Sequence, residues 1–456
     1  MNTDLFGHLF DDSVDDSQRQ HAHLTFRGNV QQGRHRWLRL TPAYSLHVVQ
    51  EILEDRVENE LVLDPFSGTG TTPLASAVLG IPAHSVDINP FLVWLGNVKL
   101  RVYDMRITDA IRFAARRCCE ELTSLRHATR VWIPELHQID KWWDHPMREA
   151  LAILFACIEH AIGHQEPMIS DLLKVAFCRV MIETSHVSFG HQSMSFKKRS
   201  GEKQQALLQA IPISDARTIV RTQFLTAIEE LAESLVKEQP IAPAQVFLGD
   251  ARELERVLPE RGYTKVVTSP PYPNRMSYIR ELRPYMYWLN FLTNGRQAGE
   301  LDWAAIGGTW GCATSNLNSW QPDPEQDIPY PQFDRIVASI SKDHKLLGRY
   351  VHKYFQDMKA HLRSLRRVMA PGGRCYYIVG NSKFYGTLLP VEEIYAVLFE
   401  DSGFITPRIK RLRKRNSKKE LYEYVVYAEV QPSSNIGLQP TAYSVRSSVA
   451  PASGSG

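Results

Sequence analysis

A tetrapeptide, Ser269-Pro270-Pro271-Tyr272, directly follows a short apolar run and has the chemistry to bind an exocyclic amino group. Each proline fixes its own φ and lacks an N–H, so the backbone offers carbonyl oxygens in set directions. The two hydrogens of an amino group need acceptors, which Ser269 and the Pro270 carbonyl could supply, while the Tyr272 ring stacks beside them. Taken alone, a proline-rich turn after a strand is the simpler explanation.

A second stretch, residues 61–89, reads as strand, glycine turn, helix, strand and acid. Its first residues are apolar and end at Asp64, which is typical of a buried parallel strand. Gly68 and Gly70 then permit a tight turn whose backbone N–H groups a ligand can approach closely. Helical spacing over 73–79 and a strand over 83–86 follow, and Asp87 ends that strand. This order predicts half of a nucleotide-binding α/β unit.

Three ligands could use this unit. A P-loop needs a lysine after its glycines, and none follows here. A dinucleotide site needs a third glycine at position 73, where the chain has proline. S-adenosylmethionine needs a carboxylate for its ribose hydroxyls, which suits Asp87, and a bare glycine turn at its methionine end. An α/β turn without any ligand is the remaining explanation, and it becomes improbable once the tetrapeptide is considered as well.

Together, residues 64–71 (DPFSGTGT) and 269–272 (SPPY) resemble the exocyclic-amino DNA methyltransferases, which methylate cytosine N4 or adenine N6. The resemblance implies S-adenosylmethionine as cofactor and an α/β, Rossmann-like methyltransferase fold. That fold has a mixed seven-stranded sheet with a C-terminal antiparallel hairpin, here with a helical insertion. The catalytic set implied is Ser269, Pro270, Pro271 and Tyr272. The cofactor contacts implied are Thr41, Pro42, Asp64, Pro65, Phe66, Ser67, Gly68, Gly70, Thr71, Asp87, Asn89 and Asp250.

The chemistry that follows is direct methyl transfer to a base that has left the duplex stack. Acceptors on both amino hydrogens would localise the nitrogen lone pair toward the methyl group, so catalysis would come from positioning and electrostatics. This chemistry needs no covalent nucleophile. Methylation of the cytosine ring carbon, in contrast, would be expected to use the cysteine of a Pro-Cys pair, and no such pair occurs in the chain. In the family, Ser-Pro-Pro-Tyr leans to cytosine N4, which we expect here. The alternatives are adenine N6, an RNA methyltransferase, and a non-catalytic protein that binds cofactor and nucleic acid.

The length of 456 residues indicates one catalytic domain with large insertions. We expect a disordered tail over 1–24 and a first, cofactor-binding part of the methyltransferase domain over 25–106. A helical insertion over 107–240 is a candidate target-recognition region. The second, catalytic part spans 241–430 and contains a loop insertion over 294–345. A disordered tail covers 431–456.

The formal net charge is only +3, so a DNA surface must be a local patch. Residues 408–419 carry eight basic side chains in twelve positions and are expected at the tip of the terminal hairpin. A solvated charged face would look the same. This density of basic residues in a nearly neutral chain is what phosphate contacts need, which favours DNA binding. A second basic segment, within 185–203, could follow a phosphate backbone or be a mobile surface loop. The DNA-binding residues expected are Lys197, Lys198, Arg199, Arg411, Arg413, Lys414 and Arg415.

The six cysteines show no C-x-x-C spacing, and no metal site is proposed. No signal sequence or membrane-length apolar run is apparent, so a soluble, cytoplasmic protein is expected. The partner implied by the resemblance is double-stranded DNA, on the modification side of a restriction-modification or related defence system. A cognate restriction endonuclease or other defence proteins encoded nearby would be further partners.

Overall fold

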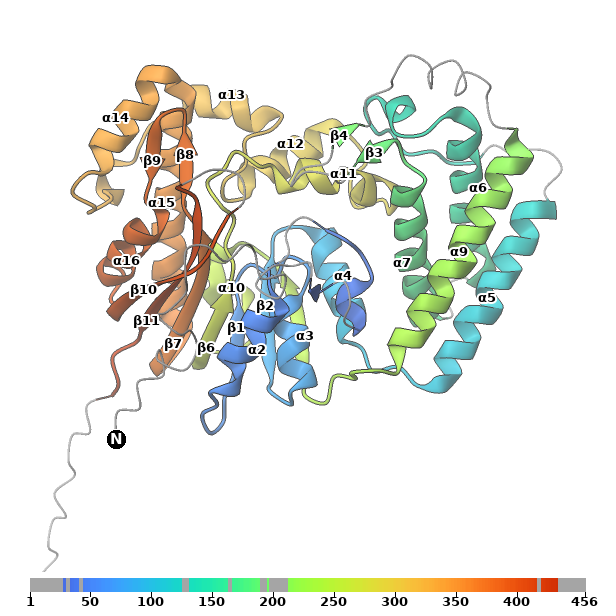
Figure 1. The fold of residues 1–456 in the computed structure, drawn as a ribbon, viewed down its shortest axis with the longest axis horizontal. Helices are drawn as coiled ribbons and strands as arrows, with labels where there is room; N and C mark the ends of the chain where they lie inside the picture. Colours follow the sequence, from blue (N-terminus) through green and yellow to red (C-terminus); the bar gives the residue numbers. More distant parts are fainter. Residues whose placement is uncertain are drawn as a thin grey trace, which may run out of the picture.

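The computed structural model describes residues 28–29, 33–40, 44–124, 131–162, 166–188, 195–196, 212–415 and 420–433 of the chain. Its centre is a twisted sheet with helices on both faces, and a group of long helices stands beside that layered core (Figure 1). Helices α11 and α12, described below, extend above the sheet toward this group (Figure 1).

The central sheet has seven strands in the order β10-β11-β7-β6-β1-β2-β5. Strands β5, β2, β1, β6 and β7 run parallel, and β11 joins β7 and β10 in antiparallel pairing. The strands are β1 (Val62–Asp64), β2 (Ala83–Asp87), β5 (Ala244–Leu248), β6 (Tyr263–Thr268), β7 (Met369–Gly380), β10 (Ile405–Lys414) and β11 (Tyr422–Glu429). Two small ribbons pair β3 (Val187–Ser188) with β4 (Ser195–Phe196), and β8 (Ser382–Phe384) with β9 (Thr387–Leu389).

Helices connect these strands. Those of the first part are η3 (Gly33–Arg36), α2 (Leu46–Glu54), α3 (Thr71–Val78) and α4 (Pro90–Leu100). The next group comprises α5 (Met105–Ser124), η4 (Ile139–Lys141), α6 (His145–Ile162), α7 (Pro167–Glu183) and α9 (Ile213–Leu235). After β5 come η6 (Ala251–Glu253) and α10 (Leu254–Val257), and after β6 come α11 (Tyr278–Trp288), α12 (Gly295–Ala304), α13 (Cys312–Ser319), η7 (Pro324–Gln326), α14 (Phe333–Asp343) and α15 (Lys345–Val368). Helix α16 (Val391–Asp401) precedes the terminal hairpin.

Alternate strand residues face opposite layers, because successive side chains of a strand point to opposite sides of a sheet. Val62 and Val267 pack with α2 in one core, whereas Leu63 and Val266 pack with α15 and α16 in the other. All four are fully buried. Apolar side chains are needed on both faces of these strands, which explains why their sequences are apolar runs rather than alternating patterns.

The long helices α5, α6, α7 and α9 fall within the range expected for the helical insertion. They share a core with α4 and α11, so the insertion is packed against the helix that follows the tetrapeptide. Trp288, at the end of α11, is fully buried there and makes edge contacts with the rings of Trp143, Phe155 and Phe177. The segment after the tetrapeptide is therefore anchored in the insertion.

The expectation of a loop over 294–345 is wrong, because this segment contains α12, α13 and α14. Leu317 of α13 and Phe333 and Ile340 of α14 are buried in the core that α15 shares, whereas α12 has a side-chain cap at its start. Asn294 caps α12 by accepting a hydrogen bond from the N–H of Gln297 at 3.0 Å.

The terminal hairpin is present, but the basic residues from Arg408 to Lys414 lie on a strand rather than at its tip. Strand β10 continues to Lys414, so most of the basic run lies on a strand at the edge of the sheet. The strand order and the hairpin confirm the predicted α/β methyltransferase fold with a helical insertion. Among the described helices, none combines the length and the apolar character that crossing a membrane would require.

Candidate active site

One cavity lies at the carboxyl ends of β1, β2, β5 and β6, where the loops after these parallel strands meet. Ligands of open α/β sheets bind at this edge. The cavity brings together residues that lie far apart in the sequence. The predicted site residues that line it are Pro65, Phe66, Gly68, Asp87, Asn89, Asp250, Ser269, Pro270, Pro271 and Tyr272. The two sequence motifs therefore share one site.

The glycine turn is held by bonds within the protein. Gly68 and Gly70 have φ values of 51° and 76°, which are strained for other residues. The Gly68 N–H donates to Asp87 Oδ2 at 2.9 Å, and the Gly70 N–H donates to the Ser67 carbonyl at 2.8 Å. These N–H groups are thus already engaged, contrary to the expectation that they face a ligand. The turn instead presents the bare Cα of Gly68 to the cavity.

Four predicted cofactor contacts, Asp64, Ser67, Gly70 and Thr71, lie behind the cavity wall and do not line it. Asp64 is fully buried and accepts hydrogen bonds from Thr268 Oγ1 at 2.6 Å and from the Phe66 N–H at 3.1 Å. Burial raises the pKa of Asp64 to about 6, although these bonds oppose the shift. Its role is to fix the turn and the start of the loop after β6, because these bonds connect the two.

Asp87 faces the cavity from the end of β2. Its Oδ1 accepts the Asn89 N–H at 2.8 Å, and its Oδ2 accepts the Gly68 N–H. Burial raises the pKa of Asp87 to about 7, against the opposing effect of these N–H groups. Asn89 also lines the cavity, and its amide nitrogen is buried and has no hydrogen-bond partner among the described residues. The carboxylate of Asp87 fits a ligand that carries hydroxyl groups, because a carboxylate only accepts hydrogen bonds when it is ionised.

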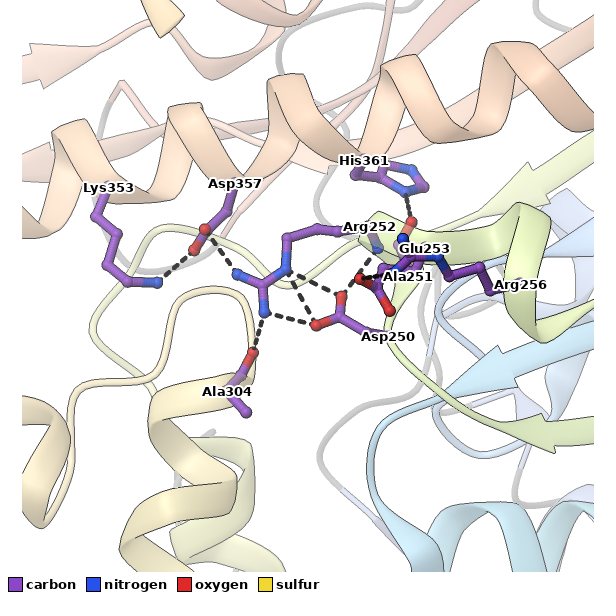
Figure 2. A network of polar contacts seen from close by, with 9 residues as sticks. All are labelled: Asp250, Ala251, Arg252, Glu253, Arg256, Ala304, Lys353, Asp357 and His361. Atoms are coloured by element: carbon purple, nitrogen blue, oxygen red, sulfur yellow. Dashed lines mark hydrogen bonds and ion pairs between the residues drawn. The ribbon is translucent and has the colours of Figure 1, made fainter. Parts of the chain in front are cut away.

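Asp250 lies at the opposite end of this wall, after β5. Figure 2 shows its carboxylate hydrogen-bonded to Arg252. The Nη2 of Arg252 donates to Oδ2 at 2.6 Å, and its backbone N–H donates to Oδ1 at 2.9 Å. The sequence analysis predicted Asp250 as a cofactor contact but did not identify Arg252 as its hydrogen-bond partner. Asp250 lines the cavity together with Ala251.

The tetrapeptide forms the facing wall. The Ser269 hydroxyl donates to the Ile378 carbonyl at 3.0 Å, which leaves the lone pairs of its oxygen as acceptors. The Pro271 carbonyl accepts a hydrogen bond from the Tyr354 hydroxyl at 2.7 Å. Within the described residues, no donor bonds the Pro270 carbonyl. Ser269 Oγ and the Pro270 carbonyl therefore both retain acceptor capacity in the loop after β6.

From its charge, Arg415 was expected to be an exposed residue at the hairpin tip. Instead, it is only 7% exposed and lines the cavity. Its guanidinium lies 5.5 Å from the centre of the Tyr272 ring and donates to the Asn381 carbonyl at 3.0 Å. A Cβ added to Gly380 would lie 2.8 Å from both Arg415 Nη1 and Tyr272 Cε2. The position therefore requires glycine so that the arginine can reach the ring.

Arg413 is also turned inward, since its Nε donates to Glu423 Oε2 at 2.6 Å and both residues line the cavity. Arg413 and Arg415, which were expected to bind DNA, make these contacts at the cavity rather than on an exposed surface. Arg411 and Lys414 are exposed on the edge strand, where basic side chains also serve to prevent pairing with another sheet.

Five predicted residues, Thr41, Pro42, Lys197, Lys198 and Arg199, lie outside the described residues. The sequence prediction also missed several lining residues, namely Tyr44, Ile88, Tyr278, Ala304, Ala305 and Ile306. Tyr44 had a signal, because it lies two residues after Pro42, one of the predicted cofactor contacts. Nothing in the local sequence marks residues 304–306, which reach the site from the end of α12.

No protein-family model matches the chain. The type II methyltransferase M.BsoBI of Geobacillus stearothermophilus is 21% identical over 443 residues, which are 88% of this chain and 85% of that protein. The type II methyltransferase M.AvaI of Nostoc sp. is 22% identical over 436 residues, covering 89% and 88%. The type II methyltransferase M.MvaI of Kocuria varians is 22% identical over 376 residues, covering 79% of each chain.

Among solved structures, the rRNA methyltransferase aviRa of Streptomyces viridochromogenes matches 85% of this chain and 86% of its own. The sequence identity is 12% and the TM-score is 0.28, a superposition too poor to support a conclusion. The sequence matches along most of the chain confirm the resemblance to methyltransferases that the two motifs indicated. S-adenosylmethionine is the methyl donor that such enzymes imply.

Proposed function

We propose that this relative of type II methyltransferases transfers a methyl group from S-adenosylmethionine to the N4 amino group of cytosine in DNA. A single observation carries the proposal: one cavity is lined on one side by Asp87 and Asp250, and on the other by Ser269 and Pro270. A donor held by the carboxylates and an amino group held by the two acceptors would meet within it.

The residues of the first wall fit S-adenosylmethionine, which supplies an electrophilic methyl group when bound. Asp87 can accept hydrogen bonds from ribose hydroxyls, because it keeps free lone pairs after accepting two N–H groups. Asn89 follows Asp87 by two residues and lines the same cavity. Asp250 can accept a hydrogen bond from the adenine amino group at the far end of that wall.

The second wall fits an amino group rather than a ring carbon. An exocyclic amine is a poor nucleophile because its lone pair is delocalised into the ring. Ser269 Oγ and the Pro270 carbonyl can each accept one amino hydrogen, and Tyr272 can stack on the base. These contacts favour a nitrogen whose lone pair points into the cavity, so the residues contribute by positioning and by electrostatics.

Cytosine is favoured over adenine by the first residue of the tetrapeptide. In the family that the chain resembles, serine at the position of Ser269 is more typical of enzymes that methylate cytosine N4, whereas aspartate there is more typical of enzymes that methylate adenine N6. Adenine N6 remains the second candidate, since the same two acceptors would serve either amino group.

Double-stranded DNA is the partner proposed, in a restriction-modification or related defence system. The exposed basic side chains of Arg411 and Lys414 lie on the edge strand that also contributes Arg413 to the cavity, and Arg415 directly follows that strand and lines the cavity as well. A phosphate backbone held along β10 would therefore bring a flipped base toward Tyr272. A cognate restriction endonuclease encoded nearby belongs to the same proposal.

The substrate is tested by incubating the purified protein with methyl-labelled S-adenosylmethionine and, in separate reactions, unmethylated DNA or transcribed RNA of the same sequences. Label in DNA is expected. Label in RNA alone would overturn the DNA assignment in favour of an RNA methyltransferase. Cofactor binding without label in either substrate, over DNA long enough to include many sequences, would favour a non-catalytic binding protein.

A further inference from the structure

Arg252 connects four parts of the molecule at the Asp250 end of the cavity. Figure 2 shows its guanidinium between the carboxylates of Asp250 and Asp357, with the carbonyl of Ala304 below. Nη1 donates to Asp357 Oδ1 at 2.7 Å, and Nη2 donates to both Asp250 Oδ2 and the Ala304 carbonyl, at 2.6 and 2.7 Å. Nε lies 3.0 Å from Asp250 Oδ1. All three guanidinium nitrogens are thus used.

These bonds fix the orientation of the Asp250 carboxylate. A carboxylate has about four acceptor sites. The backbone N–H of Arg252 takes one, and its guanidinium takes two more across both oxygens. About one site is left, on a residue that lines the cavity. That is the capacity needed for a single N–H donor from a ligand, held in one direction.

The same side chain also fixes a second piece of the wall. Ala304 ends α12, and its carbonyl is one of the helix-terminal groups without a partner inside the helix. Arg252 supplies that partner, and residues 304–306 line the cavity beside Asp250. The position of the guanidinium is itself set from α15, where Lys353 donates to Asp357 Oδ2 at 2.6 Å.

We propose that Arg252 is a positioning residue for the adenine end of the cofactor site, where it aims the Asp250 carboxylate and holds residues 304–306 against it. The inference rests on the proposed function, because it takes S-adenosylmethionine as the ligand. The planar fork is required: a lysine has one donor nitrogen and cannot bond Asp250, Asp357 and Ala304 in this geometry. Arg252 therefore determines how strongly the site prefers a purine ring with an amino group over one with a carbonyl oxygen in its place.

The test compares the binding of S-adenosylhomocysteine with that of its inosine counterpart, in which a carbonyl oxygen replaces the adenine amino group. Isothermal titration calorimetry gives both dissociation constants without any nucleic acid. We expect the wild-type protein to prefer the adenosine compound by about tenfold or more, because the inosine oxygen would leave the carboxylate without its donor. In Arg252→Lys the preference should fall to within about threefold.

Arg256→Lys is the matched control. Arg256 lies on the next turn, is 74% exposed, and pairs with Glu253 outside the network. This variant should keep the wild-type preference. Asp357→Asn is a second test in case Arg252→Lys does not fold, as judged by circular dichroism. It loosens the guanidinium from the α15 side, so an intermediate preference is expected.

The outcomes separate this inference from the proposed function. A wild-type protein that binds neither compound would overturn the proposed function and the inference with it. Tight binding of both compounds by the wild-type protein, without preference, would overturn the inference alone. The inference alone would also be overturned if Arg252→Lys folds and keeps the full wild-type preference. If Arg252→Lys does not fold, the full wild-type preference in a folded Asp357→Asn variant would overturn it.

Discussion

The hydroxyl of Tyr354 donates a hydrogen bond of 2.7 Å to the carbonyl of Pro271, in the middle of the tetrapeptide. Tyr354 is buried on α15, and its hydroxyl also lies 2.7 Å from that of Tyr395 on α16. A helix on one face of the sheet therefore holds one carbonyl in the loop that we propose is catalytic. The preceding carbonyl, that of Pro270, has no donor among the described residues, and we propose that it accepts a hydrogen bond from the substrate.

Replacing Tyr354 with phenylalanine should slow methyl transfer while leaving cofactor binding intact. The ring still fills the core, but the Pro271 carbonyl loses its donor and the loop is less firmly oriented. A hydrogen bond of about 0.5–1.5 kcal/mol corresponds to a fall of about two- to tenfold in kcat. Steady-state kinetics measures it, with Tyr395→Phe as the control that keeps the Pro271 bond. Equal loss in both variants would mean that general core packing is responsible.

Removing the Ser269 hydroxyl should damage catalysis more than any contact behind the loop. Ser269→Ala deletes one of the two acceptors for the amino group, and the loss of one such oriented group costs about 100-fold or more in kcat. The dissociation constant for S-adenosylhomocysteine should stay within about twofold, because Ser269 lies on the opposite wall from Asp87. Single-turnover kinetics and calorimetry measure the two quantities. A variant with normal turnover would exclude Ser269 as an acceptor.

Cofactor affinity should fall as the pH drops below about 7. Burial raises the pKa of Asp87 to about 7 in the free protein. Ribose hydroxyls donate to the carboxylate form, so binding favours the ionised state and lowers this pKa. Protonation at lower pH then opposes binding, by up to about tenfold per pH unit. Calorimetry with S-adenosylhomocysteine between about pH 5.5 and 8.5 tests this, and Asp87→Asn should give a weak, nearly flat profile. An unchanged slope in that variant would assign the titration to another group.

The exposed part of the basic strand should contribute to DNA affinity through charge alone. Lys414→Ala should weaken binding to all sequences alike and reduce the slope of log K against log salt concentration by about 0.9. Fluorescence anisotropy at several salt concentrations measures the slope. Arg256→Ala removes an exposed arginine elsewhere and should leave it unchanged. Loss of affinity without a change in slope would show that Lys414 does not contact phosphate.

The sequence predicted the parts of the fold that depend on local pattern. The apolar run before Asp64, the positive-φ glycines and the acid after the second strand all lie where the pattern put them. These features are readable because each is set by neighbours in the chain. The same holds for the long helices of the insertion, whose apolar periodicity extends over many turns.

The errors arose where distant contacts decide. The bulge near Leu412 shifts the register of β10 between Arg411 and Arg413, which helps turn part of a basic run into the cavity. Charge density alone could not reveal this, because it does not say which face a side chain takes. Arg252 was missed for a related reason. Its partner Asp357 is 105 positions away, and only the packing of α15 against η6 brings them together.

The central claim is that one cavity presents a methyl donor to a base amino group. Nucleoside mass spectrometry of DNA methylated by the purified protein tests this most directly, since it identifies the atom that receives the label. The account predicts N4-methylcytosine, whereas N6-methyladenine would keep the site and the chemistry but correct the base. A methyl group on a ring carbon, such as C5 of cytosine, would contradict the account, because the acceptors at Ser269 and Pro270 would then not position the atom that receives the methyl group.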